Sequence, residues 1–251
     1  MAHEKEQFEA FIDRIIEKIP YKKLYLFKKM VFHPEETIEE EKNKIAFGEG
    51  IKAIFFSSLL NGFFNGLLVA IFIVIMFLVM GGISSLTNPF NSLGFGGLGL
   101  IYAVIVLVLS TIFVPILSVA SSLISTGILY VFIRILRGEP KFKQLFYLGS
   151  IGSCASIWLS IFMMPLSIIP LVNNFVSLIL FLFNIYIIYI NYLIIKNVYG
   201  LSTKRSIGAV ALSYLSLLIL VFGLIILIYF VFVFSAIGIS FMAALLKILG
   251  N

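Results

Sequence analysis

The chain has 251 residues, of which 61% are hydrophobic and 12% charged, and its mean hydropathy is +1.13. Soluble domains average roughly 45–50% apolar and 25% charged residues, so this composition excludes a soluble globular protein and indicates a polytopic membrane protein. The net charge of +6 conceals two unlike parts, because residues 1–50 carry nine Lys/Arg against eleven Asp/Glu and residues 51–251 carry nine against one. Such a basic excess at the ends of membrane spans favours anionic lipid headgroups, and we do not expect nucleic acid as a partner.

Residues 1–46 are predicted to form amphipathic or interfacial helices on the cytoplasmic side. In residues 4–19 apolar side chains recur at spacings of three and four, the period of an amphipathic helix, and Pro20 ends the pattern. Residues 21–32 mix lysines with large apolar side chains. This second pattern fits either a segment in the membrane interface or a helix packed on the protein's own cytoplasmic face.

A third short helix is predicted to begin at Pro34 and to end before Gly48, because proline suits the first helical position. Its acidic run Glu39-Glu40-Glu41 is interpreted as a solvated face. His33 has no second His or Cys at metal-ligand spacing, so neither a metal nor any other cofactor is expected.

Residues 47–251 are predicted to form an all-α bundle of five transmembrane helices. A bilayer core about 30 Å thick needs roughly 20 apolar residues for each helical crossing. The uncharged stretch from Gln144 to Ile195 is long enough for two crossings, with Pro165 and Pro170 marking the turn between them. The predicted spans cover residues 51–80, 100–133, 145–166, 172–195 and 206–234.

The connections complete the predicted topology. Residues 81–99 contain six glycines and no charge, and are predicted to be a flexible loop on the far side. A short helix near the outer interface is expected from Ala236, because the apolar stretch runs on to Leu249 without a polar turn. Five crossings with a cytoplasmic N-terminus place every charged loop inside, as the positive-inside rule requires. Lys247 then falls outside, and six spans would return it inside, so both counts stay open.

Small and polar residues within the spans are candidates for helix packing or for a cavity lining. The first span contains two Asn-Gly pairs four residues apart, which forms a small-xxx-small face that lets another helix approach closely. Proline in the second span is expected to kink the helix, and a run of hydroxyl residues follows it. We favour packing as the interpretation. The candidates are Asn61, Gly62, Asn65, Gly66, Pro115, Asn184 and Asn191.

The predicted cytoplasmic loops supply candidate contacts to lipid headgroups or to a partner. They carry nearly all the charges that follow the first span. The expected partners are the lipid bilayer with its anionic headgroups, a second copy of the chain, or another membrane protein. The candidate contact residues are Arg134, Arg137, Lys141, Lys143, Lys196, Lys204 and Arg205.

Several short motifs occur in a characteristic order. They are Val31-Phe32-His33-Pro34-Glu35-Glu36, Gly48-Glu49-Gly50, Gly138 with Phe142-Lys143-Gln144, the Pro165 to Pro170 turn, and Lys196-x-x-Tyr199-Gly200-Leu201-Ser202. Together they resemble the Yip family, the Ypt/Rab-interacting five-span membrane proteins, and more closely its prokaryotic branch. The resemblance implies an integral membrane protein of trafficking or membrane-organising type, with no catalytic residues to carry over.

Three function classes can be compared on the residues. An enzyme needs paired carboxylates, an activated nucleophile or metal ligands, but from Ile51 onward the chain has one acid, Glu139, and no histidine, so catalysis is not expected. A small transporter or channel for a neutral solute or lipid is the alternative, since intramembrane amides and hydroxyls could line a path. A non-catalytic membrane adaptor, in the cell membrane of a prokaryote, is the function we favour.

Overall fold

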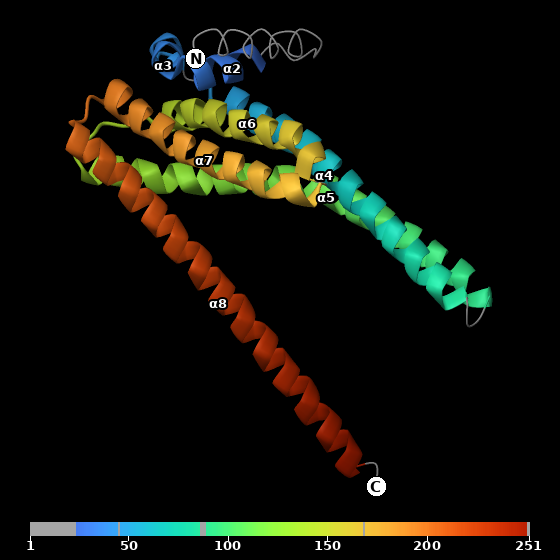
Figure 1. Cartoon of the computed structure of the whole chain (residues 1–251). Helices are drawn as coiled ribbons and strands as arrows, with labels where there is room; N and C mark the ends of the chain where they lie inside the picture. The colour runs from blue at the N-terminus through green and yellow to red at the C-terminus, as the bar shows by residue number, and fades with distance from the viewer. Residues whose placement is uncertain (1–23, 45, 86–88, 168, 250–251) are drawn as a thin grey trace.

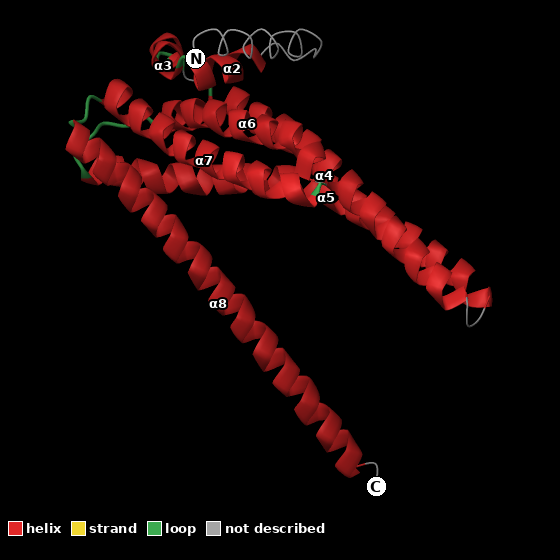
Figure 2. Ribbon diagram, viewed as in Figure 1, coloured by secondary structure: helices red, strands yellow, loops and turns green. Residues whose placement is uncertain are grey.

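The structure is a computed structural model that describes residues 24–44, 46–85, 89–167 and 169–249. Side chains are described for these residues except 24, 81–97, 171 and 236–249. The amphipathic helix predicted over residues 4–19 lies outside the described residues. Within the described ranges all regular structure is helical and there is no strand, as Figure 2 shows.

The described chain forms two short helices followed by five long ones. The long helices α4–α8 are each long and apolar enough to cross a membrane, which confirms the predicted five-span helical bundle. The bounds are α2 Leu24–Phe32, α3 Pro34–Glu41, α4 Phe47–Ser85, α5 Pro89–Ile135, α6 Phe142–Ser167, α7 Pro170–Tyr199 and α8 Thr203–Leu249.

Proline and glycine set several helix ends. Pro34 and Pro170 occupy the first turns of α3 and α7, where a missing N–H costs no hydrogen bond. Gly200 follows α7 at φ +60°, a left-handed conformation that glycine adopts without a Cβ penalty. Local sequence therefore fixes where these helices begin and end.

Two predicted connections are wrong. The glycine-rich loop predicted over residues 81–99 is mostly helical, because α4 continues to Ser85 and α5 begins at Pro89. The separate helix predicted from Ala236 is absent, since α8 runs unbroken to Leu249, and a single helix also lacks the turn that six spans would need. An apolar segment satisfies its backbone groups by staying helical, and glycine alone does not end it. Pro89 is the first residue of α5, a position where proline is tolerated.

The long helices pack in sequence, as Figure 1 shows. α4 and α5 form an antiparallel hairpin, α6 lies against α4, and α7 lies against α6. α6 is the central helix, with 56% of its most apolar window buried, whereas α8 has 0%. After its first turns against α5 and α7, α8 diverges widely from the other helices (Figure 1).

α2 and α3 pack on the bundle itself. α2 contacts α6 and α3 contacts α7. Phe27 and Met30 of α2 are buried at 3% and 0% exposure, and Ile38 of α3 is also fully buried. Of the two interpretations of residues 21–32, the structure therefore favours a helix packed on the protein for the part it describes.

Candidate functional site

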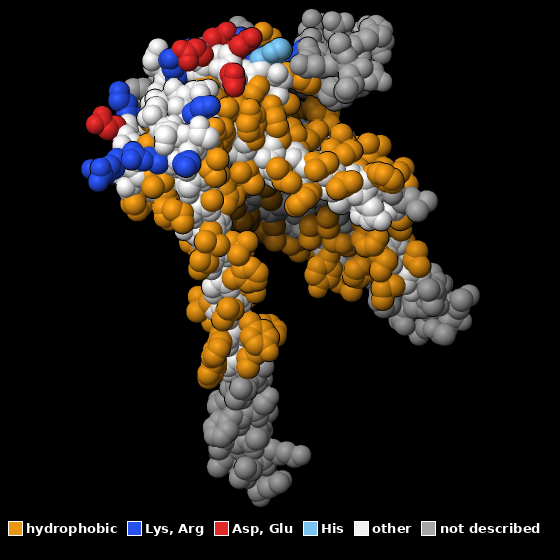
Figure 3. Space-filling view, turned by 60° about the vertical axis from the view of Figure 1, so that its left-hand side comes forward, with side chains coloured by type: hydrophobic (Ala, Val, Ile, Leu, Met, Phe, Trp, Pro, Cys, Tyr) orange, Lys and Arg blue, Asp and Glu red, His pale blue; other side chains and the backbone are white. Residues whose placement is uncertain are grey.

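Charge is concentrated at one end of the molecule, which we call the charged end. This end comprises α2, α3, the first turns of α4, α6 and α8, and the last turns of α5 and α7. Figure 3 shows acidic side chains at the top of the molecule and basic ones just below them. All seven predicted basic contact residues lie here with exposed side chains: Arg134, Arg137, Lys141, Lys143, Lys196, Lys204 and Arg205. Among the described residues, none of the seven takes part in an ion pair.

The acidic run on α3 is divided between solvent and the protein interior. Glu39 and Glu40 are exposed, but Glu41 is 2% exposed, so the interpretation of all three as a solvated face is wrong for Glu41. The Tyr147 hydroxyl donates to Glu41 Oε2 at 2.8 Å, and Lys44 Nζ lies 2.6 Å from Glu41 Oε1. Burial of a carboxylate is tolerated here because both oxygens have partners. We call these three residues the Glu41 cluster.

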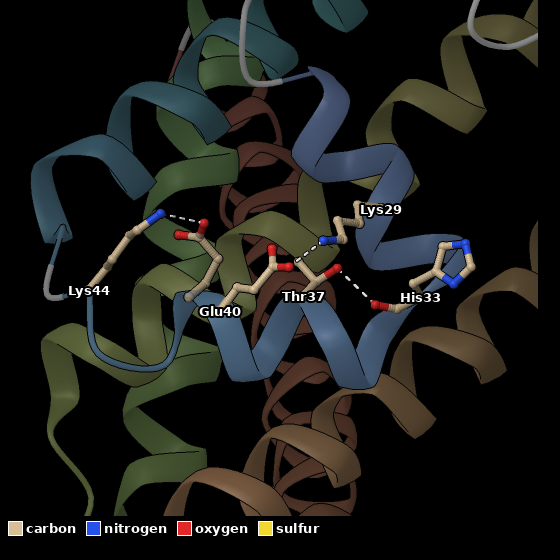
Figure 4. A network of polar contacts seen from close by, with 6 residues as sticks. Lys29, His33, Thr37, Glu40 and Lys44 are labelled. Carbon is tan, nitrogen blue, oxygen red and sulfur yellow. Dashed lines mark hydrogen bonds and ion pairs between the residues drawn. The ribbon is translucent and has the colours of Figure 1, made fainter.

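Further polar contacts hold α2 and α3 in place. Gln144 Nε2 of α6 donates to the backbone carbonyl of Lys42, and the Tyr186 hydroxyl of α7 donates to the carbonyl of Val31 at 2.6 Å. Figure 4 shows Lys29 of α2 reaching Glu40 of α3, at 2.5 Å, and Thr37 bonding the His33 carbonyl. The hydrogen bond that Lys29 donates to the Glu40 carboxylate raises the pKa of Lys29. The two helices are thus tied both to each other and to the bundle.

The two predicted glycines of the first span lie where α4 packs tightly against α5. A Cβ added at Gly62 would lie 2.6 Å from the carbonyl oxygen of Ser110, and one added at Gly66 would lie 1.9 Å from Ser110 Oγ. Neither position has room for a side chain in the present arrangement. The glycine face is therefore a helix contact, as a small-xxx-small pattern predicts.

The other predicted packing or cavity residues are dispersed. Asn65 is exposed and its amide donates to Asn61 of the same helix, at 2.9 Å to the carbonyl and 2.8 Å to the side chain. Pro115 is buried within the continuous helix α5. Asn184 is exposed and donates to the Leu180 carbonyl of its own helix at 2.8 Å. These residues do not form one site.

Asn191 lines a cavity of about 230 Å³ formed by α4–α8. Its amide donates to the Tyr214 hydroxyl of α8 at 3.1 Å. None of the residues lining the cavity is charged. We call it the polar cavity, because its lining includes Ser122, Ser125, Thr126, Ser150, Ser153, Asn191, Ser213 and Tyr214.

Sequence analysis identified the hydroxyl run of α5, which contributes to the polar cavity, but missed the burial of Glu41. Ser122, Ser125 and Thr126 recur at intervals of three and four, which places their hydroxyls on one helix face. The same spacing links Glu41 to Thr37 and Ile38, both buried at 0% exposure. A helical face that holds buried neighbours predicts burial for the charged residue too.

Among the described residues, no group of three or more His, Cys, Asp or Glu side chains could hold a metal ion. Cys154 is free and fully buried in α6. The polar cavity presents neutral hydrogen-bonding groups, and the charged end presents surface charge. Both features suit binding of a partner or ligand.

Fold and charge distribution together define a multi-pass helical membrane protein. The family model for the Yip1 domain matches residues 28–227, most of the chain, and the chain belongs to that family. No curated protein and no solved structure matches it significantly.

Proposed function

We propose that the protein is a non-catalytic membrane adaptor of the trafficking or membrane-organising type, with its charged end in the cytoplasm. The basic side chains exposed there favour that orientation under the positive-inside rule. The cell membrane of a prokaryote is the proposed location.

The observation that carries this proposal is the rigid attachment of α2 and α3 to the bundle. Tyr147 and Tyr186 fix the two helices from α6 and α7. As a result four carboxylates on α3 remain exposed at fixed positions beside the basic loops: Glu35, Glu36, Glu39 and Glu40. A surface that holds charges of both signs at fixed positions gives specificity for a partner with the complementary arrangement of charges.

Changing all four exposed α3 glutamates to glutamine is expected to weaken partner recovery from crosslinked membranes at least about tenfold, or about 1.4 kcal/mol. Glu139→Gln is the matched control, since Glu139 is an exposed acid on the loop between α5 and α6. Partners would be identified by mass spectrometry of the full-length protein. An unchanged partner set in the four-glutamine variant would contradict the adaptor proposal.

The second candidate function is transport of a neutral solute or lipid, and the polar cavity is the observation that favours it. In reconstituted liposomes, Asn191→Leu is expected to abolish flux of such a solute, because the leucine removes the amide that bonds Tyr214 across the cavity. Asn184→Leu is the control, since Asn184 lies on the same helix and is exposed. Equal flux from both variants, or no flux from the parent protein, would reject transport.

A further inference from the structure

The polar cavity can both donate and accept hydrogen bonds, and none of its lining residues carries a charge. Ser125, Ser150 and Ser213 each donate to a carbonyl of their own helix, which leaves the hydroxyl oxygens as acceptors. Tyr214 accepts from Asn191, and its own hydrogen has no acceptor among the described residues. A charged group placed here would be desolvated without a partner, whereas a neutral polar group would be satisfied.

The polar cavity reaches from Leu145, near the start of α6, to a depth below the headgroup layer of a bilayer, where its hydrogen-bonding groups lie. Ser153 and Tyr214 are each eleven residues from the start of their helices, α6 and α8. At about 1.5 Å per residue this places them roughly 16 Å from the charged end. A headgroup layer is about 5–8 Å thick on each side of the hydrocarbon core. The hydrogen-bonding groups are therefore at a depth where lipid, and not bulk water, surrounds the protein.

The volume of the polar cavity and the open space beside it indicate a ligand that the protein encloses only in part. The volume of about 230 Å³ is below the roughly 300–1,000 Å³ of pockets that enclose a whole drug-sized ligand. Ser213 is buried, yet every side chain from Leu218 to Phe232 on the same helix is exposed. Figure 3 shows open space between this part of α8 and the other helices. An apolar chain can extend into that space from the cavity.

We propose that the polar cavity binds the uncharged polar end of a neutral glycerolipid. The hydroxyl and ester groups of the lipid bond the serines, Asn191 and Tyr214. Its acyl chains lie in the space beside α8. This site is independent of the adaptor surface, and lipid binding does not require transport, so neither earlier experiment decides it.

The test uses the full-length protein in nanodiscs with a photoactivatable diacylglycerol whose diazirine lies beside an ester group. Labelling is expected in the α5 and α6 peptides that contain Ser122 and Ser153. Excess unlabelled diacylglycerol should reduce it at least tenfold, while phosphatidylglycerol and free glycerol should not. Even labelling of all lipid-facing peptides, or equal competition by phosphatidylglycerol, would overturn the proposal. Competition by free glycerol would overturn it in favour of a polyol site.

Filling the cavity provides an independent variant. Ser122→Leu combined with Ser153→Leu is expected to remove the labelling by occupying the space. Ser121→Leu is the matched control, because Ser121 is the adjacent residue on α5 and is exposed. Labelling that survives in the filled protein would count against the site. Should the filled variant fail to fold, the competition series in the parent protein gives the decision.

Discussion

Tyr147→Phe is expected to destabilise the attachment of α3 to α6 by about 2–3 kcal/mol, because it leaves a buried carboxylate without its hydroxyl donor. The Tyr147 hydroxyl lies 2.8 Å from Glu41 Oε2, and Glu41 is 2% exposed. Lys44 still pairs with the other oxygen, but its own side chain is largely exposed. Hydrogen exchange in nanodiscs should show faster exchange in α3 than in the parent protein, with α6 unaffected.

Two further variants isolate the hydrogen bond from the loss of a hydroxyl. Tyr130→Phe on α5 is the matched control, since no hydrogen bond of the Tyr130 hydroxyl occurs among the described residues, and its exchange should equal that of the parent. Combining Tyr147→Phe with Glu41→Leu should restore most of the stability, because replacing both partners by apolar groups removes the unsatisfied carboxylate. Identical exchange in the two tyrosine variants would show that the Glu41 contact contributes nothing.

Gly62→Ala is expected to lower the free energy of unfolding by about 1–3 kcal/mol, the usual cost of overpacking a close contact. The new Cβ would lie 2.6 Å from the Ser110 carbonyl oxygen, which is backbone, so α4 and α5 must move apart. Close packing is the main source of association between membrane helices, because lipid tails are as apolar as the side chains and the hydrophobic effect does not drive the helices together. Thermal unfolding in detergent, followed by circular dichroism, measures the change.

Gly127→Ala on α5 is the control, because nothing lies within 4 Å of the added Cβ. Gly66→Ala sharpens the test, since its nearest contact is the side-chain oxygen Ser110 Oγ. Ser110→Ala should therefore partly rescue Gly66→Ala and leave Gly62→Ala unimproved. A Gly62→Ala protein as stable as Gly127→Ala would mean that α4 and α5 are not in close contact at this position.

The pair Asn184 and Asn191 shows how far periodicity can predict a site. The two residues are seven positions apart, so they share roughly one face of α7. Only Asn191 lines the polar cavity, whereas Asn184 is exposed. The difference arises because α8 covers α7 near the charged end and then diverges. The helical period predicts which face of the helix a residue occupies. Whether that face contacts another helix or is exposed depends on how the neighbouring helix packs.

Sequence alone determined the five long helices, because the tendency to span a bilayer is a sum over about 20 neighbouring residues and needs no tertiary contact. The sequence also predicted the helix face that carries Gly62 and Gly66, since a repeat within one helix creates that face. The burial of Glu41 and the lining of the polar cavity were decided only by tertiary structure. Tyr147 lies 106 residues from Glu41, and the cavity takes residues from five helices. Such contacts depend on how whole helices pack, and no local sum of residue properties contains that information.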